Sequence, residues 1–279
     1  MTLFITTRAE RGYDGSKYAS CVSAQPVETP RYDKVDALEV RRKVEDKHVI
    51  LAIHGFNVSR DSGVRSLAAL ERRLALRDNE LFFGVLWPGD WWLPVINYPA
   101  EADDAVRAGR QLAAYVDENM AHAPAVSMVS HSLGGRVLLE AAQHVRRPVR
   151  ELCVTAGAVD NDVLGKGYAR AKAVSRRVSV LSSRNDMVLR LAYPLGDFGS
   201  DIFWGDNDSP WRGALGLKGP RPVEREKVEH WPIPLRPKYG HGDYFPPGGF
   251  GAADQDPDGE WTRAVRYIRR CLDGEPVAW

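Results

Sequence analysis

Cysteine is scarce in this sequence, and neither sign of charge is in excess. The 279 residues include three cysteines, Cys21, Cys153 and Cys271. Their odd number and wide spacing do not suit a disulfide framework and indicate a reducing compartment. Lysine and arginine number 38, and aspartate and glutamate number 37, so the formal charge is +1. That balance predicts no nucleic-acid or anionic-membrane partner. The arginine pairs at 72–73 and 146–147 are expected on solvated helix faces.

Long apolar runs and metal-binding motifs are also missing. No apolar run approaches the roughly 18 residues required to cross a bilayer, and the N-terminal stretch lacks the pattern of a secretory signal. No HExxH or CxxC spacing occurs. Residues 254–259 follow the first half of a calcium loop, but Pro257 interrupts it and Val265 takes the place of its last ligand. We therefore expect a cytoplasmic protein that spans no membrane and requires no metal or cofactor.

Short apolar runs alternate with amphipathic stretches through the middle of the chain. The runs expected to form buried strands cover residues 48–53, 81–87, 125–129, 151–159 and 177–181. Between them, apolar residues recur at the three- and four-residue spacing of helices, and a last helix is expected after Asp258. Strands that alternate with helices predict right-handed crossovers and a mostly parallel sheet covered on both faces. The predicted fold class is α/β, with one domain over residues 1–279.

Two stretches do not show this alternation. Residues 9–34 lack a clear period and are expected to wrap the surface or to add an edge strand. Residues 193–257 are rich in proline, glycine and aromatic side chains. A long irregular segment inside a compact domain is usually functional. We therefore expect residues 193–257 to form a lid or a pocket wall.

The sequence SHSLGG at 130–135 lies between an expected strand and an expected helix. A nucleophile elbow needs this context, with small residues two positions before and after a nucleophile that is held at strained backbone angles. Ser130 and Gly134 are both small, so Ser132 is the predicted nucleophile, at a helix N-terminus that favours developing negative charge. The alternative role of Ser132 is a helix cap. Ser130 is the weaker nucleophile candidate, because Met128 before it is not small.

A second motif, HGFN at 54–57, follows the first expected buried strand. Acyl transfer needs two N–H donors for the tetrahedral oxygen. The residue after the nucleophile, Leu133, supplies one, and a loop of this kind supplies the other. Gly55 permits the tight turn, so the backbone N–H of Phe56 is the predicted second donor. His54 is expected to hold the loop rather than to transfer protons.

The acid of a catalytic triad is expected after the nucleophile and before the histidine. Asp186 lies at the carboxyl end of the strand expected at 177–181 and is the preferred acid. Asp160 and Asp162 follow the preceding strand and are the competing candidates. The alternative role for any of these aspartates is a helix N-cap.

Only two of the seven histidines, His230 and His241, follow these acids. His241 lies in the glycine-flanked loop YGHGDY, which suits a side chain presented over a site. His230 lies in an extended segment beside Trp231, as a strand residue would. We therefore predict His241 as the general base, with an exposed loop histidine as its alternative. His131 belongs to the elbow turn and is expected to pack away from the hydroxyl of the nucleophile.

With HGFN at 54–57, SHSLGG at 130–135, Asn185-Asp186 and HGDYF at 241–245, the chain resembles the α/β-hydrolase superfamily. More narrowly, it resembles a bacterial branch that combines a His-Gly-Phe-Asn loop with a Ser-His-Ser-x-Gly elbow, in which serine replaces the first elbow glycine. The resemblance covers residues 47–190 and, beyond them, the histidine loop. It implies a parallel-rich sheet, no cofactor, and a triad of Ser132, Asp186 and His241. This fold hosts many chemistries, so the resemblance bears on reaction type more than on substrate.

Together these features predict a serine hydrolase that cleaves a carboxylic ester or a related acyl bond through an acyl-enzyme. Substrate contacts are expected from Trp87, Trp91 and Trp92, which follow the strand at 81–87, where open α/β sheets place ligands. Core anchoring is the alternative for the adjacent tryptophans. A thioesterase or acyltransferase with the same triad, and a ligand-binding protein without turnover, are the alternative functions. An interfacial lipase is disfavoured because residues 193–257 carry many charges.

Overall fold

The protein is described by a computed structural model that covers residues 1–9, 15–89, 98–191, 213–221, 226–236, 238–252, 255–256 and 259–276, with the backbone alone for 98–102. The strands are β1 (Thr2–Arg8), β2 (Gly15–Ala24), β3 (Asp33–Val35), β4 (His48–Ile53), β5 (Glu80–Leu86), β6 (Ala125–His131), β7 (Val149–Thr155), β8 (Ser175–Ser183) and β9 (Val228–Ile233). The helices are α1 (Ala37–Val44), α2 (Arg60–Leu74), α3 (Tyr98–Asn119), α4 (Gly134–His144), α5 (Ala169–Val174), α6 (Met187–Leu191), α8 (Leu215–Lys218) and α9 (Glu260–Asp273).

The strands form one nine-stranded sheet in the order β3-β2-β1-β5-β4-β6-β7-β8-β9. From β1 to β9 every neighbouring pair is parallel, and only β1–β2 and β2–β3 are antiparallel. The α/β fold with a mostly parallel sheet is thus confirmed. After β4 the chain moves to β5 on one side and then to β6 on the other. Open α/β sheets bind ligands in the crevice beyond the carboxyl ends of the strands at such a reversal, which here falls between β4 and β6.

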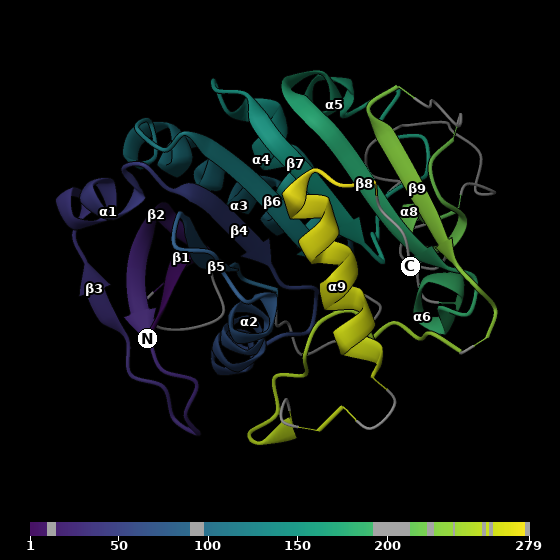
Figure 1. The fold of residues 1–279 in the computed structure, drawn as a ribbon, viewed down its shortest axis with the longest axis horizontal. Coiled ribbons are helices and arrows are strands. Elements are labelled where there is room, and N and C mark those ends of the chain that lie inside the picture. The colour runs from purple at the N-terminus through teal and green to yellow at the C-terminus, as the bar shows by residue number, and fades with distance from the viewer. Residues whose placement is uncertain are drawn as a thin grey trace.

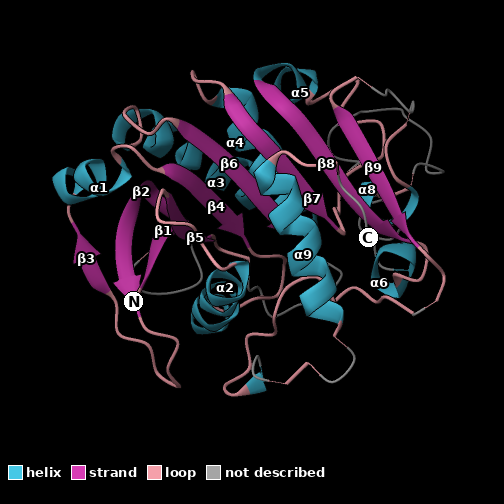
Figure 2. Cartoon of the chain, viewed as in Figure 1, coloured by secondary structure: helices cyan, strands magenta, loops and turns pink. Residues whose placement is uncertain are grey.

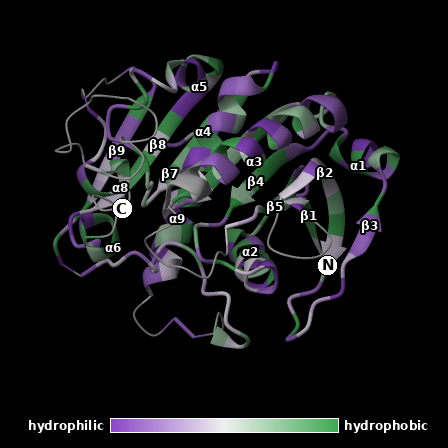
Figure 3. Ribbon diagram, turned by 180° about the vertical axis from the view of Figure 1, so that it is seen from behind, coloured by the Kyte–Doolittle hydropathy of each residue, from purple (hydrophilic) through white to green (hydrophobic). Residues whose placement is uncertain are grey.

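Helices cover both faces of the twisted sheet (Figure 1). Helices α2 and α9 pack together on one face, while α3 and α4 pack together on the other, with α1 beside α3 and α5 beside α4 (Figure 2). All six residues of β4 are buried, as expected for a strand covered on both faces. The central strands are strongly hydrophobic and the short edge strand β3 is hydrophilic (Figure 3). No helix within the described residues is long and apolar enough to cross a membrane.

The two stretches without a clear period contain more regular structure than the sequence predicts. Strands β2 and β3 form the expected edge, but β1, which pairs with β5, was not predicted. Within 193–257, β9 completes the other edge of the sheet beside β8, and its residue His230 is the strand residue expected. Residues 192–212 lie outside the described part. The lid or pocket wall predicted there remains a prediction.

The start of α9 explains the sequence that resembles a calcium loop. The carboxylate of Asp256 accepts hydrogen bonds from the N–H and the hydroxyl of Thr262, at 3.0 and 2.7 Å. These two bonds hold the first turn of α9. Among the described residues there is no group of three or more histidine, cysteine or acidic side chains that could hold a metal ion.

Candidate active site

The turn between β6 and α4 holds Ser132 in a left-handed conformation, with φ of +56°. Such a conformation is strained for a residue with a side chain and persists only where its surroundings fix it. Here the N–H of Ser132 donates to Thr155 O at 3.1 Å, and its carbonyl accepts from the N–H of Ala158 at 3.1 Å. Both backbone groups are therefore held by the segment that leaves β7. The sequence indeed folds into the strand–turn–helix elbow that it predicts.

Two glycines let the HGFN loop lie directly against this elbow. A β-carbon on Gly55 would stand 2.9 Å from Cβ of Ser132, and one on Gly134 would stand 2.4 Å from the carbonyl oxygen of His54. Strand pairing sets this approach, because Ile53 of β4 lies beside Ser130 of β6. The loop after β4 and the nucleophile turn after β6 therefore share the crevice at which the strand order reverses.

Replacing Gly134 by alanine is expected to destabilise the protein strongly. The new methyl group would overlap backbone atoms, which cannot swing aside as a flexible side chain can. Overpacking of this kind costs about 3 kcal/mol or more. Urea unfolding measures the loss. Gly167→Ala is the control, since a β-carbon there meets no atom within 4 Å. Equal unfolding midpoints for the two variants would contradict the close packing of the elbow.

A continuous chain of hydrogen bonds joins Ser132, His241 and Asp186. The hydroxyl Oγ of Ser132 lies 2.8 Å from Nε2 of His241, and Nδ1 of His241 lies 2.7 Å from Oδ2 of Asp186. A carboxylate accepts but does not donate, so Nδ1 carries the ring proton and Nε2 accepts from the serine hydroxyl. Ser132 is 6% exposed and Asp186 is fully buried. The structure thus brings together the three residues predicted from separate parts of the sequence.

Asp186 uses its two carboxylate oxygens for different tasks. While Oδ2 holds His241, Oδ1 accepts from the N–H of Leu189 at 2.9 Å and so caps the short helix α6. The sequence offered the triad acid and the helix cap as alternatives, and the geometry combines both contacts in one side chain. Asp160, the competing acid, lies in a segment that forms a backbone bridge with Ala214.

The loop that carries His241 is fastened at several points that the sequence did not predict. The hydroxyl of Ser183 donates to Tyr239 O at 2.8 Å, and the carboxylate of Asp243 accepts from the N–H of Gly240 at 2.6 Å. The rings of Tyr239 and Tyr244 are fully buried and meet edge to face with centroids 5.0 Å apart. Burial and the nearby Asp186 charge raise the pKa of Tyr244, so its hydroxyl stays neutral.

His131 also fastens this loop. Its Nε2 lies 2.7 Å from the backbone carbonyl of His241, and because a carbonyl only accepts, Nε2 carries the proton. Its ring packs against Tyr244 and Phe245, with centroids 5.9 and 5.6 Å away. Burial and the neighbouring His241 lower the pKa of His131 to about 3. The packing role predicted for His131 therefore includes a hydrogen bond from the nucleophile turn to the histidine loop.

Replacing His131 by phenylalanine is expected to lower kcat for ester hydrolysis about tenfold while KM changes little. The ring packing persists but the donor to the His241 carbonyl is lost, and a buried hydrogen bond of this kind contributes about 1–2 kcal/mol. His131→Gln supplies an N–H at a similar reach and should restore part of the rate. Steady-state kinetics on a soluble ester distinguish the two variants. If KM rose and kcat fell to the same extent in the phenylalanine and glutamine variants, the positioning role would be contradicted.

His54 and Trp87 hold the other side of the site. Nδ1 of His54 donates to Gly55 O at 2.8 Å, which leaves Nε2 to accept from the N–H of Trp87 at 3.4 Å. The indole N–H of Trp87 donates to His54 O at 2.8 Å, and the two rings stack. Burial lowers the pKa of His54 to about 3, so it stays neutral. His54 supports the loop as predicted. Trp87 is fully buried beneath it, which differs from the pocket wall predicted for this side chain.

Acid is expected to unfold the protein through its buried histidines. The folded pKa values of His54 and His131 are lowered to about 3, and that of His48 to about 4. An unfolded histidine titrates near 6.5. The stability is therefore complete above about pH 6.5 and falls as the pH drops from there towards 3, because only the unfolded state takes up protons. Each histidine contributes a slope of up to about 1.4 kcal/mol per pH unit.

Urea midpoints between pH 7 and pH 4 measure this slope. His131→Phe removes one partly buried titrating group and should flatten this slope. The matched control is His122→Ala, because His122 is exposed, and this variant should keep the slope of the wild type. Identical slopes for all three proteins would mean that the buried histidines do not control acid unfolding.

Leu133 follows Ser132 in the chain, and Phe56 follows Gly55, which lies against Ser132. Within the described part of the chain, no acceptor takes the backbone N–H of either Leu133 or Phe56. The Phe56 loop is fixed from behind, because Gly89 O accepts from the N–H groups of Asn57 and Val58 at 2.5 and 3.4 Å. Arg8 also donates to Val58 O at 2.9 Å. The loop therefore offers a fixed donor beside the elbow.

The remaining predicted site residues are placed elsewhere or are not described. His230 lies in β9, where its Nε2 is 2.8 Å from the hydroxyl of Ser182. Among the described residues no carboxylate contacts His230, whereas Asp186 contacts His241. Trp91 and Trp92, predicted to contact substrate, lie outside the described residues. The fastening by His131 and Ser183 had no distinctive sequence signal, because both side chains bind backbone carbonyls far along the chain.

Comparison with solved structures finds distant similarities. A SOBER1 variant from Arabidopsis thaliana is 14% identical, with a TM-score of 0.48, over 82% of this chain and 98% of that one. Esterase 2 from Thermogutta terrifontis is 11% identical, with a TM-score of 0.43, over 93% and 96%. Carboxyl esterase 2 from the mycorrhizal fungus Tuber melanosporum is 11% identical, with a TM-score of 0.44, over 94% and 89%.

No curated protein matches the sequence. The family model described as an alpha/beta hydrolase of unknown function matches residues 34–197, which is more than half of the chain and includes β4, the elbow and Asp186. The chain therefore belongs to this family of α/β hydrolases.

Proposed function

We propose that the protein is a serine hydrolase, with Ser132, His241 and Asp186 as its triad, and that it cleaves a carboxylic ester. The observation that carries the proposal is the hydrogen-bonded chain from the serine hydroxyl to the buried carboxylate, with steps of 2.8 and 2.7 Å. Because the nine strands form one sheet, we also propose that residues 1–279 are a single hydrolase domain.

In the proposed acylation step, Nε2 of His241 takes the proton of Ser132 while Oγ attacks the ester carbonyl carbon. Asp186 keeps the proton on Nδ1 and stabilises the imidazolium that forms. The N–H groups of Phe56 and Leu133 receive the negative oxygen of the tetrahedral intermediate, and removing one such donor typically costs about 100- to 1000-fold in rate. His241 then gives its proton to the leaving alcohol, and an acyl-serine remains.

In the proposed deacylation step, His241 removes a proton from water, which attacks the acyl-serine. The second tetrahedral intermediate collapses and returns the proton to Ser132 Oγ. His54 and His131 take no part in these transfers, because their rings stay neutral, and both nitrogens of His54 and Nε2 of His131 are engaged with backbone groups. Trp91 and Trp92 remain the proposed substrate contacts. Buried Trp87 acts in this scheme by holding the loop of Phe56.

The test is labelling with a fluorophosphonate probe together with hydrolysis of short p-nitrophenyl esters. The wild type should label at Ser132 and turn over. His241→Ala should lose both activities. His230→Ala should keep them, and it is a matched control because His230 also contacts a serine hydroxyl, at 2.8 Å. A folded wild-type protein that neither labels nor hydrolyses any ester would favour ligand binding without turnover.

A further inference from the structure

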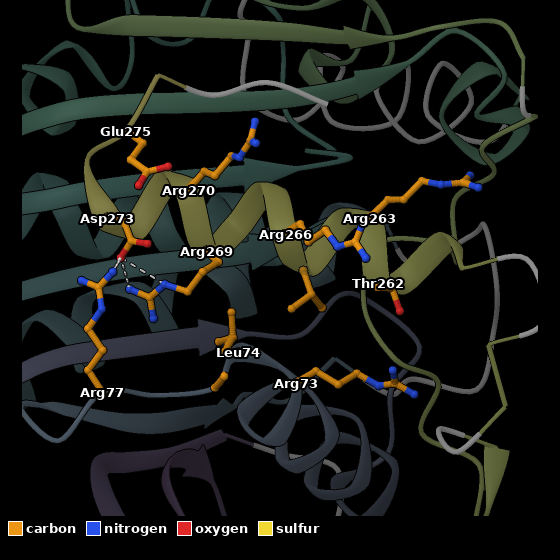
Figure 4. Close-up of a pocket in the computed structure, with 12 residues that line it drawn as sticks. Arg73, Leu74, Arg77, Thr262, Arg263, Arg266, Arg269, Arg270, Asp273 and Glu275 are labelled. Carbon is orange, nitrogen blue, oxygen red and sulfur yellow. Dashed lines mark hydrogen bonds and ion pairs between the residues drawn. The ribbon is translucent and has the colours of Figure 1, made fainter.

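Two basic grooves lie away from the candidate active site. The first, about 790 Å³ in volume, lies between the end of α2 and α9 (Figure 4). Its charged lining residues are Arg73, Arg77, Arg263, Arg266, Arg269, Arg270, Asp273 and Glu275. The second, about 630 Å³, lies where β7 and β8 begin, and we call it the β7–β8 groove. Its charged lining residues are Arg146, Arg147, Arg150, Arg170, Arg176 and Lys227, and no acidic side chain is among the described residues that line it.

The groove between α2 and α9 is partly neutralised by the protein itself. Asp273 contacts Arg77 at 2.8 Å and Arg269 at 2.5 Å, as the dashed lines in Figure 4 show. Arg269 is also paired with Glu80 at 2.6 Å. The first groove therefore has internal counter-ions for part of its charge, and it provides an internal comparison for the second.

Three cations of the β7–β8 groove are bound to helix ends. Arg147 donates to the carbonyls of Met120 and Ala123, just after α3. Arg170 donates to Gln143 O at the end of α4 at 2.7 Å, and Lys227 donates to Ala173 O at the end of α5 at 3.0 Å. Cations at helix C-termini are favourable. These carbonyls carry only partial charge, however, so most of the positive charge stays in the groove.

The pairing of β7 with β8 places two further arginines side by side. Val149 lies opposite Ser175 and Glu151 opposite Arg177, so Arg150 and Arg176 stand at the same register between these pairs. Residues at one register of neighbouring strands point to the same face, and like charges in such positions repel. One position further along, Glu151 and Arg177 form an ion pair at 2.8 Å on the opposite face. The sheet thus pairs opposite charges on one face and like charges on the other.

The two acidic side chains near these arginines form their ion pairs with other cations, although the charge of Glu151 also acts on Arg150 and Arg176. Glu151 is engaged by Arg177, and Asp117 is engaged by Arg146 at 3.3 Å. Nε of Arg150 is buried without a hydrogen-bond partner among the described residues, although a buried donor normally has one. Both short basic segments were expected on solvated helix faces. Arg147 instead lies half-buried against the end of α3, and its position concentrates charge at the starts of the strands.

We propose that the β7–β8 groove binds a small soluble anion that carries two or more phosphoryl groups. Guanidinium groups match phosphate oxygens in charge and in bidentate geometry. A volume of about 630 Å³ lies within the range of small-molecule sites and exceeds what one phosphate fills. The groove lies at the starts of the strands, whereas Ser132 and Asp186 follow the strand ends, so this site is separate from the candidate active site.

Titration calorimetry with inorganic tripolyphosphate, at constant ionic strength and without divalent metal, tests the proposal. The wild type should bind one tripolyphosphate per chain. Arg150→Gln and Arg176→Gln should each weaken binding about 10- to 100-fold, since each removes hydrogen bonds between charged groups. Arg266→Gln in the groove between α2 and α9 is the matched control and should leave the affinity unchanged. No binding by the wild type, or an equal loss in all three variants, would overturn the proposal.

Thermal unfolding without ligand gives a second readout. Arg176→Gln relieves the repulsion with Arg150, so this variant should melt at or above the wild-type temperature, while tripolyphosphate should stabilise it less than it stabilises the wild type. A variant that merely folds poorly would melt lower in both conditions. Sedimentation with phosphatidylglycerol vesicles tests the other source of phosphoryl groups, which is the headgroup of an anionic lipid. Binding to the vesicles without binding to tripolyphosphate would overturn the assignment to a soluble ligand.

Discussion

Ser132→Ala is expected to lower kcat/KM for ester hydrolysis roughly 10⁴- to 10⁶-fold and to abolish fluorophosphonate labelling. Only this hydroxyl contacts Nε2 of His241 among the described residues, at 2.8 Å, so its removal leaves no nucleophile for the acyl-enzyme route. Residual rate would come from the backbone donors and from substrate binding alone. Active-site titration with the probe, followed by mass spectrometry of the labelled peptide, measures the effect.

Ser130→Ala is the control for this variant. Ser130 is the other serine of the elbow sequence, but it is fully buried, and its hydroxyl has no hydrogen-bond partner within the described residues. Its loss should therefore leave labelling and turnover close to wild type. Labelling that persists in Ser132→Ala and disappears in Ser130→Ala would transfer the nucleophile to Ser130 and contradict the proposed triad.

Asp186→Asn is expected to lower kcat about 10⁴-fold, for a reason that comes from the two tasks of this side chain. The oxygen of the asparagine amide would stay with the N–H of Leu189, which Oδ1 of Asp186 now accepts at 2.9 Å. The amide NH₂ would then face Nδ1 of His241 and force the ring proton onto Nε2. A histidine in that tautomer cannot accept the proton of Ser132, and a comparable change in a serine protease costs about 10⁴.

If the asparagine amide were turned the other way, its oxygen would face Nδ1 of His241 and restore the tautomer. Its NH₂ would then face the N–H of Leu189, and the cap of α6 would be lost. Stopped assays of p-nitrophenyl ester hydrolysis measure the loss, with Asp160→Asn as the matched control. Asp160 was the competing acid in the sequence, and its replacement should change kcat less than tenfold. If Asp160→Asn is the more damaging variant, the assignment of Asp186 as the triad acid is wrong.

Local patterns were sufficient to predict the centre of this fold. The five apolar runs became β4 to β8, because strands buried on both faces need nearly continuous apolar sequence. The strands at the two edges of the sheet could not be predicted from their own sequence patterns. Edge strand β3 comes at the end of a stretch without a clear period, and edge strand β9 lies within a segment rich in proline and glycine. Edge strands depend on tertiary pairing more than on their own pattern.

In the candidate site, too, some features were predictable from local patterns and others were not. Ser132 and Gly134 were predictable because an elbow imposes small residues at fixed positions, and Asp186 and His241 because chain order restricts the choice. The contact of His131 with the His241 carbonyl was not predictable, since its acceptor is a backbone carbonyl, which every residue carries. The burial of Trp87 beneath His54 was missed as well, because a tryptophan after a strand suits a pocket wall and a core equally.

The positions of the three triad residues along the chain have a consequence for how activity develops during folding. Ser132 and its backbone donor loop need only the pairing of β4 with β6, whereas the contact between Ser132 and His241 spans 109 residues. The histidine loop is also fastened to the sheet, because Ser183 at the end of β8 donates to Tyr239 O, so the loop can dock only on strands that have already paired. A refolding chain should therefore acquire its sheet before it acquires a working base. During refolding, ester turnover should recover later than the circular dichroism signal. A chain still being synthesised should likewise have no activity until the histidine loop has docked.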